Sequence, residues 1–138
     1  MSYIIGIDPG NEESGYIILD TSVGFPGTPV YFGKVSENEL KGRLGQFFKR
    51  SEMSKKYTLS QIHTGIEMVA SYGMPVGRTV FDTCAVIGRL EQAISSLSIY
   101  DGMKVDKNGL SKNVHRIYRK RVSDEGINST TMELYLHR

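Results

Sequence analysis

The sequence predicts a single α/β domain in which three consecutive strands are followed by strands that alternate with helices. Short apolar runs rich in β-branched residues occur at 3–7, 14–19 and 30–35, separated by turns that contain Gly and Pro. Two longer segments, about 37–50 and 79–97, repeat apolar residues at helical spacing. The 138 residues are 39% hydrophobic and 23% charged, which is typical of one globular domain and disfavours disorder, collagen-like repeats and coiled coils.

The first predicted strand ends in a carboxylate. The apolar run 3–7 is followed by Asp8 and then by a Pro-Gly turn, and 14–19 resumes as a second strand. These two strands predict a β-hairpin with the carboxylate held at its base, so Asp8 is a candidate for chemistry and not for packing. The Gly- and Pro-rich loop 21–29 leads to the third strand at 30–35, which completes an antiparallel meander.

The middle of the chain predicts a helix and a fourth strand. Ser36, with Glu39 three residues later, has the spacing of a capping box, and the apolar pattern then predicts a helix from about 37 to 50. After a polar connection, residues 62–69 form an apolar strand that is interrupted by one acid, Glu67, near its end.

Glu67 is open to two explanations, because a buried carboxylate is costly unless it is neutralised, paired or bound to a metal. One explanation is an ion pair with a neighbouring Lys or Arg. The other is a divalent cation shared with Asp8, since both acids lie near the carboxyl ends of hydrophobic strands and would meet if those strands are neighbours.

The second half of the chain predicts a long helix, a fifth strand and a short last helix. The Gly- and Pro-containing loop 70–78 would let a substrate backbone approach closely. The helix 79–97 has a wide apolar stripe, which indicates burial against the sheet and either a second subunit or the rest of one monomer. Residues 114–122 form the fifth strand, and in the last helix Glu133 and His137 would stand side by side, as a functional pair or as a plain solvated one.

Charge is unevenly distributed, although the net formal charge is only +2. Residues 104–121 hold a basic cluster with Asp106 as its one acid; its members are Lys104, Lys107, Lys112, Arg116, Arg119, Lys120 and Arg121. Such an excess suits a polyanion such as nucleic acid, or it forms a solvated basic face without a partner.

Cys84 is the single cysteine, so the chain forms no internal disulfide and no cysteine-rich zinc site. The sequence starts directly in a strand pattern without the features of a signal peptide, and no apolar run approaches the roughly 18 residues of a membrane-spanning helix. We therefore expect a soluble, cytoplasmic protein.

The ordered motifs resemble those of RuvC-type Holliday junction resolvases, which belong to the ribonuclease H-like superfamily, and especially the bacteriophage and prophage branch. The matching motifs are IGIDPG at 5–10, GIE at 65–67, SYGMPVG at 71–77 and IYRK at 117–120. The resemblance covers the chain from about residue 3 to 122. It implies a ribonuclease H-like fold, with a five-stranded mixed sheet made of the antiparallel meander and two parallel strands, flanked by helices.

The resemblance also implies an activity, which is metal-dependent cleavage of four-way DNA junctions by a homodimer that makes paired nicks. Asp8 matches the aspartate that bridges two Mg²⁺ ions, and Glu67 matches the glutamate that binds one of them, with Mn²⁺ able to substitute. The homodimer would form through the 79–97 helix, in the cytoplasm of a bacterial or phage-infected cell. The residues expected to contact DNA are Ser71, Tyr72, Arg78, Lys112, Arg116, Arg119, Lys120 and Arg121.

Residues 123–138 diverge from the family, whose members carry two further metal ligands on a helix after the fifth strand. Three accounts are compatible with this ending: a truncated or frame-altered product without full activity, an enzyme that uses Glu133 and His137 as the missing ligands, or a junction-binding protein that does not cleave. An alternative from another class of protein is an actin-like ATPase. Such ATPases also open with a strand, an acid and a glycine turn, but their fold needs a second similar half.

Overall fold

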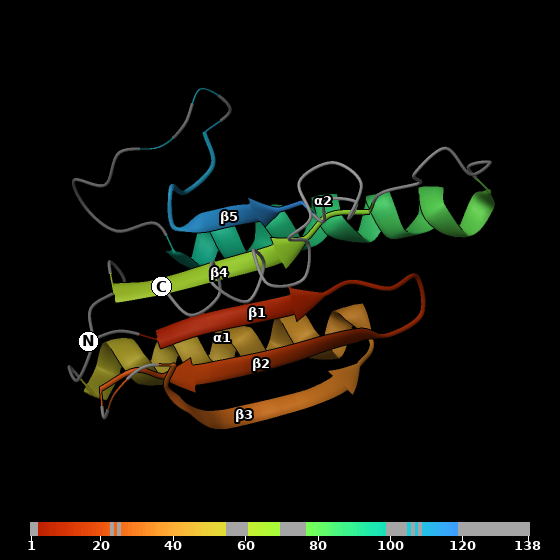
Figure 1. The fold of residues 1–138 in the computed structure, drawn as a ribbon. Coiled ribbons are helices and arrows are strands. Elements are labelled where there is room, and N and C mark those ends of the chain that lie inside the picture. The colour runs from red at the N-terminus through yellow and green to blue at the C-terminus, as the bar shows by residue number, and fades with distance from the viewer. Residues whose placement is uncertain are drawn as a thin grey trace, which may run out of the picture.

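A computed structural model describes residues 3–22, 24, 26–54, 61–69, 77–98, 105, 107 and 109–118 of the chain. These residues form five strands and two helices in the order β-β-β-α-β-α-β (Figure 1). The elements are β1 (Tyr3–Asp8), β2 (Ser14–Asp20), β3 (Thr28–Val35), α1 (Glu37–Ser54), β4 (Ile62–Glu67), α2 (Arg78–Ser98) and β5 (Val114–Ile117).

The strands form one mixed sheet in the order β3-β2-β1-β4-β5. β1 pairs with β2 and β2 with β3 in antiparallel fashion, whereas β1 with β4 and β4 with β5 are parallel. This arrangement confirms the predicted fold class, an antiparallel meander joined to two parallel strands. It also places β1, the strand that ends at Asp8, in the centre of the sheet.

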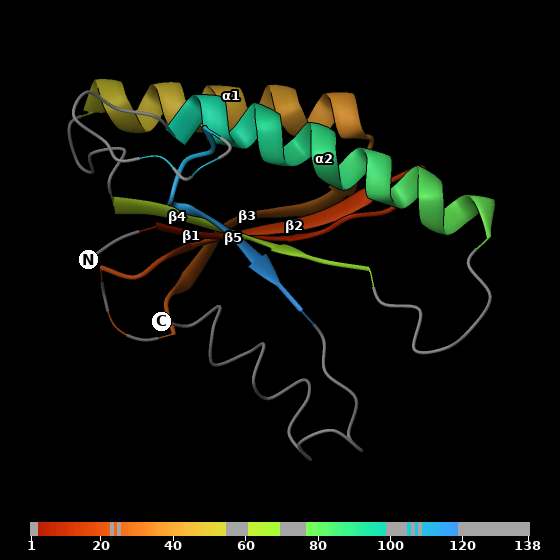
Figure 2. The same ribbon diagram turned by 90° about the horizontal axis from the view of Figure 1, so that it is seen from above.

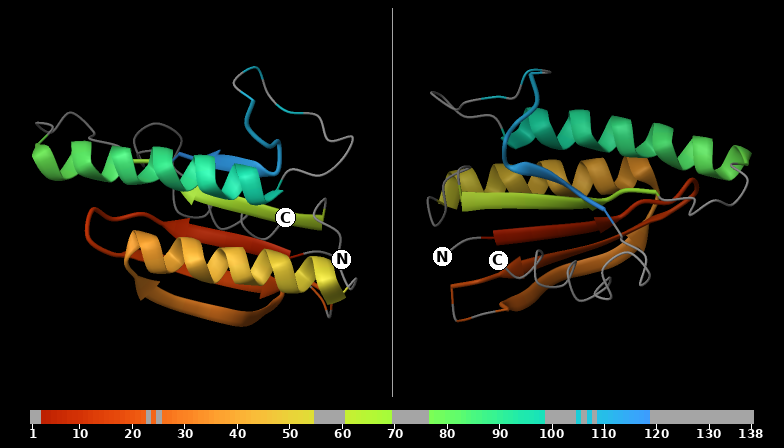
Figure 3. Two further views of the ribbon diagram at one scale, coloured as in Figure 1. Left: turned by 180° about the vertical axis from the view of Figure 1, so that it is seen from behind. Right: turned by 45° about the horizontal axis from the view of Figure 1, so that its top comes forward.

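Both helices lie on one face of the sheet (Figures 2 and 3). The hydrophobic core fills the space between them because alternate strand residues point to that face, including Ile5, Ile18 and Ile66, all almost completely buried. Leu44 of α1 and Leu90 of α2 close the core from the helix side. We call the opposite face of the sheet, which carries the other set of strand residues, the far face.

The bounds of α1, β3, β4 and β5 differ from the sequence predictions by two or more residues. Helix α1 continues four residues past 50, and Ser51 in this extension is buried. β4 ends at Glu67 instead of residue 69, and β5 ends at Ile117, although the Met68 amide still donates to the Ile117 carbonyl at 2.8 Å. The predicted last helix from residue 130 lies outside the described residues.

No helix among the described residues is long and apolar enough to cross a membrane.

Candidate metal centre

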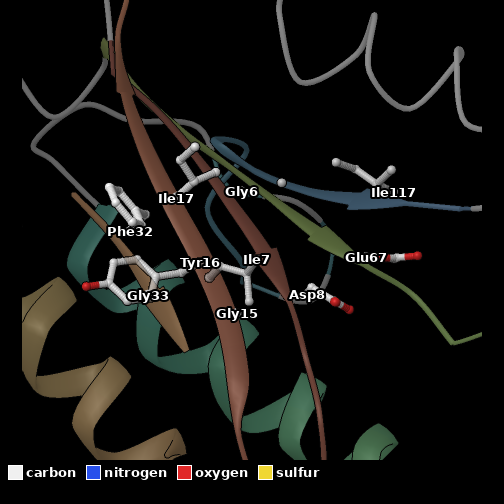
Figure 4. Close-up of a pocket in the computed structure, with 11 residues that line it drawn as sticks. Gly6, Ile7, Asp8, Gly15, Tyr16, Ile17, Phe32, Gly33, Glu67 and Ile117 are labelled. Atoms are coloured by element: carbon white, nitrogen blue, oxygen red, sulfur yellow. The ribbon is translucent and has the colours of Figure 1, made fainter. Parts of the chain in front are cut away.

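Strand register brings Asp8 and Glu67 together, although they are far apart in sequence. In the parallel β1–β4 pair the last matched residues are Ile7 and Ile66. Asp8 and Glu67 are the next residues of the two strands and therefore stand side by side. Neighbouring strands are about 4.8 Å apart. Ile7 and Ile66 point into the core, so both carboxylates project from the far face, as Figure 4 shows.

The backbone around Asp8 is fixed by small residues. Gly15 lies opposite Asp8 in the β1–β2 hairpin, and a Cβ added there would have the Asp8 Cβ as its nearest neighbour, at 3.8 Å. The Gly10 amide donates to the Ser14 hydroxyl oxygen at 3.3 Å, and a Cβ at Gly10 would collide with the Glu13 carbonyl oxygen. Only glycine therefore fits the turn that presents Asp8.

A depression of about 490 Å³ lies at the two carboxylates. It is lined by residues of all five strands, namely Gly6, Ile7, Asp8, Gly15, Tyr16, Ile17, Phe32, Gly33, Gly65, Glu67 and Ile117 (Figure 4). Four of these eleven residues are glycines, which let a substrate backbone approach the strands closely.

Two adjacent carboxylates suit a hard divalent cation. Mg²⁺ is commonly held by one or two protein carboxylates, with waters and substrate phosphates completing its octahedron, and Asp8 and Glu67 supply that donor set. Within the described part of the chain, no group of three or more His, Cys, Asp or Glu residues forms a ligand cluster. The further ligands predicted from the sequence, Glu133 and His137, lie outside the described residues.

The residues predicted to contact DNA are not all at this site. Arg78 begins α2, is 94% exposed and lies 3.8 Å from Asp82. Lys112 precedes β5 and is exposed, and it lies at the opposite end of the sheet from the carboxylates, since β5 starts level with Thr64 of β4. Ser71, Tyr72, Arg119, Lys120 and Arg121 lie outside the described residues.

Arg116 has a structural contact that the charge pattern did not predict. Its position in β5 is level with Ile66, so its side chain points to the helix face. There it donates from Nε to Glu91 of α2 at 2.6 Å and from Nη2 at 3.3 Å, and this pairing raises the pKa of Arg116. Arg116 therefore joins β5 to α2.

Sequence reasoning missed four residues on the far face. Phe32 and Lys34 of β3 lie in register with residues of the candidate metal centre. His63 of β4 and His115 of β5 contact each other through ring nitrogens 3.1 Å apart. Alternation along a strand predicts which of its residues share a face. Placing these four residues on one surface also requires knowing that β2 pairs with β3 and β4 with β5.

Comparisons with known proteins agree with the fold. No protein-family model and no curated protein matches the chain. Among solved structures, RuvC of T. thermophilus in complex with a Holliday junction substrate is similar, with 11% sequence identity and a TM-score of 0.50. The match covers 86% of this chain and 65% of that one, so the chain spans about two-thirds of the length of its structural relative.

A second solved structure, the Aquifex aeolicus PPX-GPPA enzyme, has 10% identity and a TM-score of 0.40, and it covers 85% of this chain and 36% of that chain. That similarity is too low to support an argument. The likeness to RuvC, at 11% identity, establishes the fold alone: a ribonuclease H-like α/β sheet.

Proposed function

We propose that this protein is a divalent-cation-dependent DNA endonuclease that resolves four-way junctions. The observation that carries the proposal is the pair Asp8 and Glu67, which stand side by side at the carboxyl ends of β1 and β4 in a ribonuclease H-like sheet. The likeness to a junction-bound RuvC structure and the motifs around both acids support the substrate class.

Asp8 and Glu67 would hold Mg²⁺, or Mn²⁺ in its place, through their carboxylate oxygens. The bound cation supplies charge stabilisation for phosphodiester hydrolysis and activation of water at neutral pH. Asp8 is suited to share two ions because it projects from the central strand, and Glu133 and His137 are proposed as additional ligands. Rigid strands fix both acids, while Gly6 and Gly65 beside them leave room for a phosphate backbone.

Paired nicks on a four-way junction need two such sites, and we propose that a homodimer provides them. The proposed interface is the side of α2 that turns away from the sheet, where Phe81 is largely exposed. Arg119, Lys120 and Arg121 would contact DNA phosphates, and the host would be a bacterial or phage-infected cell, with the protein in its cytoplasm.

Cleavage of a synthetic four-way junction tests the proposal. The wild-type protein should nick the junction in Mg²⁺ or Mn²⁺ but not in EDTA, and Asp8→Asn should reduce the rate at least 10³-fold, because removing one ligand charge weakens cation binding. Glu52→Gln is the control: this carboxylate is exposed on α1, on the helix side of the sheet, and the rate should not change.

A folded wild-type protein that fails to nick any junction in either cation would overturn the catalytic proposal. If that protein still bound junctions tightly and with steep salt dependence, it would be a junction-binding protein without catalysis.

A further inference from the structure

A row of residues crosses the far face of the sheet at the level of the two carboxylates. Lys34 of β3 pairs with Gly15 of β2, and Gly15 pairs with Asp8 of β1, beside which stands Glu67 of β4. Gly15 has no side chain, so nothing on β2 stands between the Lys34 side chain and Asp8. Lys34 is exposed, and no ion pair of its ammonium occurs among the described residues.

Phe32 lies on the same face, one row further from the strand ends. It is 73% exposed, more than any other large hydrophobic residue described. Its register partner is Ile17, which is level with Gly6, and Gly6 is level with Gly65. The Ile17 side chain therefore stands between the ring and the two glycines, and Phe32 lines the same depression as Asp8 and Glu67 (Figure 4).

An exposed aromatic ring beside a cation on a sheet surface is the chemistry that binds single-stranded nucleic acid. Bases stack on aromatic side chains regardless of sequence, and lysine binds phosphate as a point charge. Phe32 and Asp8 are two strands apart, which is roughly 10 Å across the sheet. One strand of an opened junction could thus lie over both residues.

We propose that Phe32 and Lys34 position the substrate strand over the carboxylate pair. In this arrangement Lys34 contacts a phosphate of the strand that lies at Asp8 and Glu67, and Phe32 stacks on an unpaired base of that strand. The inference rests on the proposed function for the identity of the substrate, and it gives β3 a role in binding.

The test measures binding separately from cleavage. Each protein is titrated, in Ca²⁺ so that no cleavage is required, into a four-way junction with a fluorescent base analogue beside the crossover. Phe32→Leu removes the ring and keeps an apolar side chain. Loss of one stacked base is worth about 1–3 kcal/mol, so affinity should fall roughly 5- to 150-fold and the analogue should lose its quenching. Phe32→Tyr keeps an aromatic ring and should retain both the affinity and the quenching of the analogue.

Lys34 is tested through the salt dependence of the same binding. Lys34→Gln removes one phosphate contact, so the slope of log K against log salt should become shallower by about 0.7–0.9. Lys34→Arg should restore the slope. Lys49→Gln is the matched control, because Lys49 is an exposed lysine on α1, on the other side of the sheet, and its loss should leave the slope unchanged.

The outcomes separate this inference from the proposed function. Unchanged junction affinity, quenching and salt slope in Phe32→Leu and Lys34→Gln overturn the inference, whether or not the wild type cleaves. Ring- and lysine-dependent binding without wild-type cleavage supports the inference and contradicts the catalytic proposal. If Phe32→Leu changes only the oligomeric state by size-exclusion chromatography, Phe32 belongs to a contact between copies and the inference is wrong.

Discussion

His63 and His115 form a hydrogen-bonded pair on the far face. The ring nitrogens Nδ1 of His63 and Nε2 of His115 are 3.1 Å apart, and the ring centroids are 5.4 Å apart. The difference of 2.3 Å is about two ring radii, so the nitrogens point directly at each other. One nitrogen must accept, which requires a neutral ring. Burial lowers the pKa of both histidines, and the neighbouring His63 lowers that of His115 further.

The first prediction concerns the pH dependence of stability. Because the folded-state pKa of each histidine lies below the unfolded value of about 6.5, the unfolded chain binds more protons in that range. The contribution of the pair is complete above pH 6.5 and is lost as pH falls through the folded pKa values. The urea midpoint of wild type should thus fall between pH 7.5 and 5, and the fall should be smaller in the His63→Gln, His115→Asn double variant.

Equal midpoint changes in both proteins would mean that the pair does not titrate as described. Glu37, whose pKa is lowered to about 2 chiefly by its hydrogen bonds to Arg89, remains ionised over the whole range and does not contribute to the fall.

Single residues also show what sequence could predict about the site. Asp8 and Glu67 could be identified because an acid at the end of an apolar strand is visible in one strand, although the structure leaves Asp8 exposed and Glu67 only half-buried. Phe32, Lys34 and the histidine pair have no such local signal. Their significance depends on which residue of a neighbouring strand each one faces, and register is a property of two strands.

At the scale of elements, β5 and α2 are held together by the Arg116–Glu91 ion pair. Glu91 is buried, at 8% exposure, whereas Arg116 is about half exposed. The sequence placed Arg116 in a basic cluster suited to DNA because charge density ignores the direction of side chains. Strand alternation sends Arg116 to the helix face, opposite to its neighbours His115 and Ile117.

The second prediction is that Arg116→Gln destabilises the fold. The substitution leaves a buried carboxylate without its strongest partner, which should cost about 2 kcal/mol in the free energy of unfolding, measured by urea denaturation at pH 7. Arg78→Gln is the control, since Arg78 is almost fully exposed and its contact with Asp82 is long, and it should change stability by less than about 0.5 kcal/mol. A normal unfolding midpoint in Arg116→Gln would contradict this account.

The wide apolar stripe of α2 has a structural explanation within one chain. Ile94 and Leu90 are buried in the core above the sheet, while Arg89 of the same helix donates two hydrogen bonds to Glu37 of α1, at 2.7 and 2.8 Å. The helix thus packs against the sheet and lies against α1. The sequence predicted burial on more than one side but could not identify the second surface, because helical periodicity records how much of a helix is covered and not by what.

At the scale of the whole molecule, both helices cover one face of the sheet, and Asp8 and Glu67, the carboxylates of the proposed cation site, project from the other. The order of strands and helices could be predicted because each element has its own periodicity. The composition of the far face could not be predicted from the sequence, because its residues come from all five strands and only the strand order brings them together.

The third prediction follows from this separation of core and site. Millimolar Mg²⁺ or Ca²⁺ should raise the melting temperature of wild type, with stabilisation that grows as RT ln(1 + [cation]/Kd), about 1.4 kcal/mol for each tenfold increase above Kd. EDTA should reverse the rise. Asp8→Asn should melt at or above the wild-type temperature without cation and gain little from it, because the two carboxylates no longer repel each other or chelate. A full cation response in Asp8→Asn would place the binding site elsewhere.

The register of β1 with β4 also determines when the proposed cation site can form during folding. Asp8 and Glu67 are 59 positions apart in the chain (67 minus 8), whereas β1, β2 and β3 pair with their sequence neighbours. A meander of β1 to β3 therefore carries one carboxylate without the other, and the second arrives only when the long α1 connection has closed and β4 has docked. If β4 docks after the rate-limiting step of folding, divalent cations will leave the folding rate unchanged and will slow unfolding. Measuring both rates before and after adding a chelator would therefore show at which stage of folding β4 docks.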